Sequence, residues 1–308
     1  MSVLIVGTVA YDTIETPFGR AERILGGSAT YSGLSSQYFA APVRVVSVVG
    51  EDFDAEHWSL LETRGLDLTG VQREEDGKTF AWEGRYHYDL NHRDTLATHL
   101  NVLETFRPHL PEGYRNSRIV CLGNLDPTIQ SEVLDQVEHP ELVICDTMNF
   151  WIEHTPEALR QLLQRIDVLI INDSEARELA QVPNLIRAAR IIRRMGPDVL
   201  VIKKGEHGAL LFLDDMIFSA PAYPLEDVQD PTGAGDTFAG GFAGYLAGCS
   251  DIDENALKMA VIYGSVMASF VVEAFGPYRL LDLERADINQ RMEEFRQLSA
   301  VPTEVQLL

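Results

Sequence analysis

The sequence has few cysteines, no long apolar run and no recognisable leader. Its three cysteines, Cys121, Cys145 and Cys249, are odd in number and widely spaced, and no Cys-x-x-Cys pair occurs. We therefore expect buried thiols rather than a disulfide framework or a cysteine metal site. No stretch approaches the roughly 18 uninterrupted apolar residues of a membrane span, so we expect no membrane partner. The chain runs directly into the apolar segment Val3 to Val6 without a basic leader, which favours a cytoplasmic location.

Positive charge is also scarce. The chain carries 25 Lys and Arg against 47 Asp and Glu, a formal net charge of −22. Sequence-independent binding to nucleic acid depends on neutralising phosphates with Lys and Arg, so we expect no nucleic-acid partner. A small anionic ligand would meet a repulsive field, which a bound cation and local basic groups would have to offset.

The most informative segment lies near the C-terminal third. Asp230 to Asp236 reads Asp-Pro-Thr-Gly-Ala-Gly-Asp and precedes a run of small and apolar residues, 237–246, typical of a buried helix. A glycine turn that opens a helix leaves backbone N–H groups unpaired at the positive end of the helix dipole, which favours an anion such as phosphate. The structural alternative is a tight turn with a capping aspartate. The segment matches neither the P-loop nor the dinucleotide fingerprint.

Asp236 lies at the start of that helix, beside the expected anion pocket. A carboxylate there would repel phosphate unless it had a chemical task. We interpret it as the general base that takes a proton from an attacking hydroxyl.

The rest of the chain alternates apolar runs with helical periodicity, which indicates βαβ units and a parallel sheet covered on both faces. The apolar runs lie at 3–6, 43–49, 119–122, 142–145, 168–171 and 199–202. Most are followed by polar residues or glycine. Ligands of open α/β sheets bind at these carboxyl ends.

One segment breaks this pattern. Residues 78–100 alternate apolar or aromatic with polar residues, as half-exposed antiparallel strands do. We predict a small β lid formed by about 12–26 and 76–102, hinged at Gly26 and Gly27. Because no linker or internal repeat is visible, we expect one domain, 1–308.

These features together resemble the ribokinase-like sugar and nucleoside kinases, the PfkB family, over nearly the whole chain. The motif 230–236 with Phe238, Gly240 and Gly241 is similar to the family's C-terminal signature. The resemblance implies a three-layer α/β/α sandwich with a mostly parallel central sheet and a small inserted β-sheet lid. It also implies that Gly233, Ala234 and Gly235 form an anion hole and that Asp236 is the catalytic base.

Other site residues follow from the same resemblance. ATP and Mg²⁺ are the implied cofactors, with Glu175 holding Mg²⁺ through water and Asp230 near a monovalent cation such as K⁺. The implied nucleotide-binding residues are Asn172, Glu175, Lys203, Gly205, Glu206, Gly208, Thr232 and Gly264. The implied substrate-binding residues are Asp12, Gly26, Gly27, Tyr31 and Asn124.

Each match has a structural alternative when it is taken alone. Asn172 and Glu175 form a capping-box pattern, and Gly205 and Gly208 suit a hairpin turn. Asp12 suits a turn, and Gly26-Gly27 suits a loop.

Departures from the family pattern concern the acceptor. Tyr31 stands where many members have asparagine, Ala10 replaces a further asparagine, and Ser28 stands where several sugar-binding members have lysine. Aromatic residues of the lid and nearby loops could stack on a nucleobase, or they could pack the lid or a dimer contact. These residues are Tyr31, Phe80, Trp82, Tyr86 and Tyr88.

We therefore predict transfer of the γ-phosphoryl group of Mg-ATP to a primary hydroxyl of a ribonucleoside or sugar, with a slight preference for a nucleoside. One alternative is a non-catalytic sugar- or nucleotide-sensing protein on the same fold. Another is a sugar-phosphate kinase, for which Arg85 and Arg93 are the nearby basic residues. A homodimer through the lid is also expected. The sequence leaves the acceptor, the oligomeric state, the monovalent-cation dependence and the pathway open.

Overall fold

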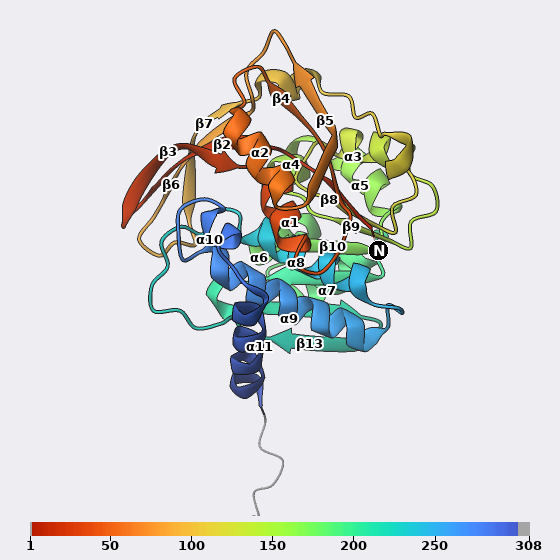
Figure 1. The fold of residues 1–308 in the computed structure, drawn as a ribbon. Helices are drawn as coiled ribbons and strands as arrows, with labels where there is room; N and C mark the ends of the chain where they lie inside the picture. The colour runs from red at the N-terminus through yellow and green to blue at the C-terminus, as the bar shows by residue number, and fades with distance from the viewer. Residues whose placement is uncertain (1, 301–308) are drawn as a thin grey trace, which may run out of the picture.

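A nine-stranded sheet forms the centre of the computed structural model, which describes residues 2–300 (Figure 1). The strand order is β13-β12-β11-β10-β9-β8-β1-β4-β5. All neighbours from β5 to β11 pair in parallel, and β12 and β13 add an antiparallel edge. The mostly parallel sheet expected from the apolar runs is therefore confirmed.

The strands and helices have the following bounds. The strands are β1 Val3–Val6, β2 Ala10–Thr16, β3 Gly19–Gly26, β4 Val43–Gly50, β5 Leu66–Glu74, β6 Ala81–Tyr86, β7 Arg93–His99, β8 Ile119–Leu122, β9 Leu142–Cys145, β10 Val168–Asn172, β11 Val199–Lys203, β12 Ala209–Leu213 and β13 Met216–Ala220. The helices are α1 Ser28–Ser36, α2 Ala55–Thr63, α3 Pro127–Leu134, α4 Asn149–His154, α5 Pro156–Leu163, α6 Asp173–Ala180, α7 Leu185–Arg193, α8 Ala234–Gly248, α9 Glu254–Val271, α10 Tyr278–Leu281 and α11 Arg285–Ser299. Short 3₁₀ turns lie at Asn101–Thr105, Glu112–Tyr114 and Gly205–His207.

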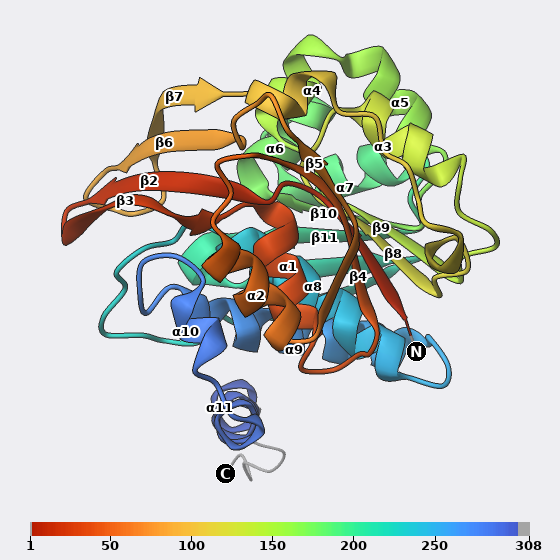
Figure 2. The same cartoon turned by 45° about the horizontal axis from the view of Figure 1, so that its top comes forward.

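Helices cover both faces of the large sheet and make two apolar cores. Alternate residues of one strand serve opposite faces, so Val3 and Ile5 join one core while Leu4 and Val6 join the other. Helices α1, α8, α9 and α11 contribute to the first core, and α5, α6 and α7 to the second. Figure 2 shows the two helix layers on either side of the sheet. The fold is therefore the predicted three-layer α/β/α sandwich.

A separate four-stranded sheet projects from one end of the body, in the order β3-β2-β6-β7 (Figure 2). The pairs β2/β3 and β6/β7 are antiparallel, but β2 and β6 run parallel, so the pairing is mixed. This follows from the connectivity, because β6 enters the small sheet only after the chain has passed through β4, α2 and β5.

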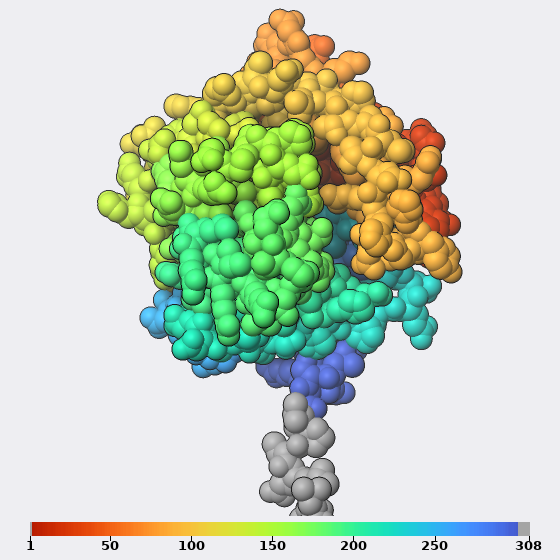
Figure 3. Space-filling model, turned by 180° about the vertical axis from the view of Figure 1, so that it is seen from behind, coloured from red at the N-terminus to blue at the C-terminus, as the bar shows by residue number. Residues whose placement is uncertain are grey.

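The small sheet borders a hollow in the molecular surface. In Figure 3 this hollow lies between the orange residues of the small sheet and the green residues of the body.

Among residues 2–300, no helix combines the length and the apolar character that a membrane crossing requires.

Candidate active site

The N-terminus of α8 has the geometry expected of an anion site. Gly233 precedes the helix with φ 74°, a left-handed conformation that favours glycine. A Cβ added there would lie 2.5 Å from ring atoms of Tyr31, so the ring packs directly on this glycine. A Cβ on Gly235 would lie 2.8 Å from Lys203 Nζ. The turn Gly233, Ala234, Gly235 therefore has a lysine ammonium beside it.

Lys203 forms a buried ion pair at the carboxyl end of β11. Its Nζ lies 3.5 Å from Asp146 Oδ2, and the two side chains are only 16% and 11% exposed. Burial acts to lower the pKa of Lys203, but the neighbouring charges of Asp146, Glu175 and Asp236 raise it overall, so the side chain stays charged. Asp146 was not among the predicted site residues. Its position directly after β9 was the only sequence signal that could have indicated it.

Asp236 lies in the first turn of α8 and is held by its backbone. Ser32 Oγ of α1 donates a hydrogen bond to its carbonyl oxygen at 2.9 Å. Burial and the nearby charge of Asp146 raise the pKa of Asp236 to about 7, against the opposing effects of Lys203 and Arg93. A carboxyl group with a pKa near neutrality has the acid–base balance expected of a general base.

Asp12 lies on β2 of the small sheet and is 5% exposed. A Cβ on Gly26 would lie 2.0 Å from Asp12 Oδ2, so only glycine fits there. Burial and the charges of Asp230 and Asp236 raise the pKa of Asp12 to about 7, although the Gly27 N–H donates to its carboxylate. Asp12 and the diglycine thus form one packed unit.

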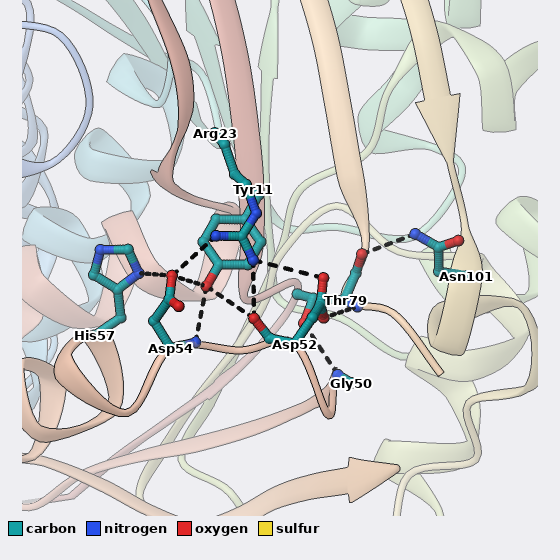
Figure 4. A network of polar contacts seen from close by, with 8 residues as sticks. All are labelled: Tyr11, Arg23, Gly50, Asp52, Asp54, His57, Thr79 and Asn101. Carbon is teal, nitrogen blue, oxygen red and sulfur yellow. Dashed lines mark hydrogen bonds and ion pairs between the residues drawn. The ribbon is translucent and has the colours of Figure 1, made fainter. Parts of the chain in front are cut away.

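The residue before Asp12 is tied to the body on the other side of β2 (Figure 4). Tyr11 Oη donates to Asp54 Oδ2 at 2.7 Å, and the Asp54 N–H donates back to the phenol oxygen at 2.9 Å. The guanidinium of Arg23 lies over the Tyr11 ring, 3.8 Å from its centroid, and contacts Asp54 at 3.0 Å. Asp52 extends the network by accepting from the Thr79 N–H at 2.7 Å. This network anchors the base of the small sheet.

Asp230 is 1% exposed and shapes the loop before α8. Its carboxylate accepts from the Thr232 N–H at 2.8 Å and from the Gly276 N–H at 3.2 Å. Burial raises its pKa. Thr232 Oγ1 in turn donates to Tyr86 Oη at 3.2 Å, so the loop is linked to β6 of the small sheet.

Arg93 extends from β7 next to Tyr86, its direct neighbour across the sheet. Its guanidinium lies 5.5 Å from the centroid of the Trp82 ring. The side chain stays exposed to solvent, and within residues 2–300 it forms no ion pair shorter than 4.0 Å. Its positive charge nevertheless opposes the pKa elevation that burial causes at four carboxyl groups: Asp12, Asp146, Glu175 and Asp236. Arg93 is therefore a cation that hydrogen-bonds Tyr86, forms no ion pair among residues 2–300 and acts on the carboxyl groups of the site.

Asn172 and Glu175 form the capping box of α6. The Glu175 N–H donates to Asn172 Oδ1 at 2.9 Å, and the Asn172 N–H donates to Glu175 Oε2 at 2.7 Å. The capping box that the sequence offered as a structural role is therefore formed, and it holds Glu175 near Lys203 and Asp146. Burial and the charge of Asp146 raise the pKa of Glu175 to about 7.

The remaining predicted residues differ in their surroundings. Gly205 and Gly208 have positive φ values in the β11–β12 hairpin, and Glu206 between them is exposed. Gly264 lies in α9, where an added Cβ would be 2.9 Å from the Phe238 carbonyl oxygen, so it serves close packing of α8 on α9. Asn124 accepts from Trp151 Nε1 at 2.8 Å.

The aromatic residues do not form one stacking platform. Tyr31 is 1% and Tyr86 6% exposed, so neither ring presents a free face, and Tyr88 is 86% exposed in the β6–β7 turn. Phe80 and Trp82 are half-buried. Of these two, Trp82 packs its ring on Gly84 and is the cross-strand neighbour of Asp12.

Comparisons with known proteins agree with this geometry. A family model described as pfkB family carbohydrate kinase matches residues 3–283. A cytidine kinase of Thermococcus kodakarensis is 30% identical over 286 residues, covering 91% of this chain and 99% of that protein. A nucleoside kinase of Methanothermobacter thermautotrophicus is 27% identical over 293 residues, covering 89% and 90%. The structure of Burkholderia thailandensis nucleoside kinase in complex with ADP-inosine has the same fold, with a TM-score of 0.77 at 21% identity and 99% of both chains covered.

Proposed function

We propose, from the premise that the chain belongs to the pfkB family of carbohydrate kinases, that it is a nucleoside kinase. It transfers the γ-phosphoryl group of Mg-ATP to a primary hydroxyl of a ribonucleoside. One observation carries the proposal: Asp236, which follows the glycine turn at the start of α8, lies close enough to Asp12 of the small sheet for its charge to raise the pKa of Asp12.

The reaction needs positioning and charge compensation more than covalent participation by the protein. The acceptor oxygen forms a bond to the γ-phosphorus, the bond from that phosphorus to the bridging oxygen of ADP breaks, and the hydroxyl proton passes to Asp236. A pKa of about 7 leaves a large part of Asp236 ionised at neutral pH, ready to accept the proton.

Positive charge for the transferring group comes from three sides. The N-terminus of α8 supplies unpaired N–H groups and the helix dipole. Lys203 lies beside Gly235, and Arg93 of the small sheet acts on Asp236 through its positive charge. These groups offset the repulsion expected from a net charge of −22.

The acidic residues fit a Mg²⁺ ion that arrives with the nucleotide. Glu175 uses Oε2 in the capping box, which leaves Oε1 for a metal-bound water. Within residues 2–300, no group of three or more acidic, His or Cys side chains forms a metal cage. Mg²⁺ commonly binds one or two carboxylates together with substrate phosphates and waters, so Glu175 is a sufficient anchor. The ion would neutralise phosphate charge when bound.

Asp230 fits a role near a monovalent cation such as K⁺. The carboxylate is buried, accepts from two backbone N–H groups and interacts with the Thr232 side chain, but no Lys or Arg lies within ion-pair distance of it among residues 2–300. A nearby cation would compensate this charge.

The choice of a nucleoside over a sugar rests on the relatives named as cytidine kinase and nucleoside kinase. The half-buried Phe80 and Trp82, of which Trp82 lies next to Asp12 across the small sheet, support it, because a flat base can stack on such rings. A sugar-phosphate kinase would use Arg93 to bind the acceptor phosphate. A sensor without turnover is disfavoured because Asp236, the glycine turn and Lys203 are all present and in place.

The small sheet has two proposed roles. As a lid it closes the hollow and excludes water during transfer. Its large exposed apolar side chains also make it the proposed surface for a homodimer; they are Phe18, Tyr88, Leu96 and Leu100. Sedimentation velocity of the wild type and a Leu96→Glu variant tests the dimer, which predicts a mass of twice 34.4 kDa for the wild type alone.

The decisive experiment measures ADP release from Mg-ATP with cytidine, inosine, ribose and fructose 6-phosphate as acceptors, using the wild type and Asp236→Asn. We expect turnover with a nucleoside that the variant loses. Turnover with ribose or the sugar phosphate only would overturn the choice of acceptor. No turnover with any acceptor, combined with ligand-induced thermal stabilisation, would support the sensor.

A further inference from the structure

The Tyr31 side chain is buried but its hydroxyl is unpaired. Tyr31 lies in α1, one turn after Gly27, whose carbonyl accepts from the Tyr31 N–H at 3.2 Å. The residue is 1% exposed, and its hydroxyl has no hydrogen-bond partner among residues 2–300. A buried hydroxyl without a partner lowers stability, and such groups are rare in folded proteins. The hydroxyl therefore needs a reason to remain there.

The surroundings of Tyr31 place this hydroxyl in the active site. Its ring packs on Gly233 of the anion turn, with three ring atoms 2.5 Å from the position of a Cβ on that glycine. Among charged groups, Asp12, Asp230 and Asp236 have the largest effects on the pKa of the phenol. Tyr31 thus stands between the aspartate of the small sheet and the first turn of α8.

The phenol is a donor at any physiological pH. Burial raises its pKa well above the usual value, and the charges of Asp12, Asp230 and Asp236 raise it further. The O–H group therefore stays intact. The partner it lacks is an acceptor oxygen that the protein does not supply.

A ring hydroxyl of the acceptor meets this requirement. A hydroxyl group donates one proton and accepts through its oxygen. A ring hydroxyl that donates to Asp12 still has lone pairs to accept from Tyr31. The attacked primary hydroxyl is a poorer partner, because its proton must reach Asp236 and a lone pair must face phosphorus.

Resting on the function proposed above, we propose that the Tyr31 hydroxyl recognises a ring hydroxyl of the acceptor together with Asp12. The acceptor class is then a ribonucleoside, and the corresponding deoxyribonucleoside is discriminated against. A site that is built to hydrogen-bond a substrate hydroxyl rejects the analogue without it, since its own polar groups are left unpaired.

The test compares kcat/KM of the wild type and Tyr31→Phe with cytidine, 2′-deoxycytidine and 3′-deoxycytidine, and with the same three forms of inosine. We expect Tyr31→Phe to lose about 3- to 10-fold with the ribonucleoside, the range of one neutral hydrogen bond. With the deoxy form that lacks the contacted hydroxyl, the loss should vanish. An equal loss with every acceptor overturns the proposal, as does no loss with any of them.

Thermal unfolding of the ligand-free protein separates recognition from structure. Tyr31→Phe keeps the ring and removes only the unpaired hydroxyl, so its melting temperature should equal or exceed that of the wild type. The matched control is Tyr114→Phe, whose hydroxyl donates to the Asp67 carbonyl at 2.8 Å and which lies outside the site. It should melt lower and keep the wild-type ratio of ribonucleoside to deoxyribonucleoside. A lowered melting temperature of Tyr31→Phe would mean that the hydroxyl has a structural partner and would overturn the proposal. Absence of turnover in the wild type with every nucleoside is a different result, because it rejects the proposed function itself.

Discussion

Two neighbouring residues of β2, Tyr11 and Asp12, face opposite surroundings. On the Tyr11 side, the phenol, Asp54 and Arg23 bond to one another over distances of 2.7 to 3.0 Å, and among the described residues only His57 Nδ1 of this network, 3.7 Å from Asp54, lacks a hydrogen bond. On the Asp12 side, Asp236, Tyr31 and Arg93 carry charges or hydroxyls without full partners.

The pKa values of Asp54, on the Tyr11 side, and of Asp12 are shifted in opposite directions. The hydrogen bond from Tyr11 lowers the pKa of Asp54, whereas burial raises the pKa of Asp12 to about 7. A polar network whose hydrogen bonds are all formed stabilises a fold, whereas buried polar groups without partners are available to bind a ligand. The small sheet is thus anchored through one face of β2, and the other face carries Asp12 of the proposed site.

The largest effect is expected from Asp236→Asn. The amide keeps the shape of the side chain but cannot accept the hydroxyl proton, so kcat should fall by roughly 100-fold or more. Steady-state kinetics with saturating Mg-ATP and acceptor measures this. Activity within about twofold of the wild type would contradict the role of Asp236.

The next effect concerns Arg93. Arg93→Ala removes a positive charge that acts on the carboxyl groups of the site and should lower kcat by about 10- to 100-fold, the range of one charged hydrogen bond. The matched control is Arg85→Ala. Arg85 lies on β6 next to Tyr86, the cross-strand neighbour of Arg93, and its charge is paired with Glu15 at 2.9 Å. That variant should stay within about twofold of the wild type. A rise in the acceptor KM alone for Arg93→Ala would instead indicate binding of an acceptor phosphate.

A smaller effect concerns the pH dependence of stability. Asp12, Glu175 and Asp236 have folded-state pKa values of about 7, against ordinary values of 3.8 to 4.5. Between these limits the folded protein keeps protons that the unfolded chain has released, so stability should fall as pH rises from about 4 to about 7.

Asp12→Asn replaces one of these titrating carboxyl groups with a neutral amide, so its contribution to the pH dependence is lost. At pH 8 its melting temperature should exceed that of the wild type, by about 2–4 °C for each kcal/mol by which the cost of burying the charge is reduced. Near pH 4 the two melting temperatures should match. Calorimetry across this range measures the difference. A difference that is the same at both pH values would contradict the assignment.

The smallest effect is expected on the satisfied side. Arg23→Ala breaks an exposed ion pair and a cation–π contact, which together contribute on the order of 1 kcal/mol. The melting temperature should fall by a few degrees while kcat/KM stays within about threefold. A loss of activity as large as that of Arg93→Ala would show that the two faces of β2 are not independent.

Local sequence predicted much of this structure because apolar runs and glycine turns act over short distances. The strands from β8 to β11, the fold class and membership of the kinase family are confirmed. The aromatic residues are a different case. Tyr31 and Tyr86 are as aromatic as Trp82, yet helix and strand packing buries them. No local pattern separates a packed ring from an accessible one.

The sequence by itself predicted the two ends of the proposed site, Asp12 after the first strand and the glycine turn before Asp236, because φ preferences and helix N-termini are local properties. Only the tertiary structure decided which groups meet there. Lys203 beside Gly235, Asp146 beside Lys203 and the unpaired Tyr31 hydroxyl come from segments far apart in the chain. Their pKa values and their lack of partners depend on burial and on charges across the hollow, which are properties of the assembled fold.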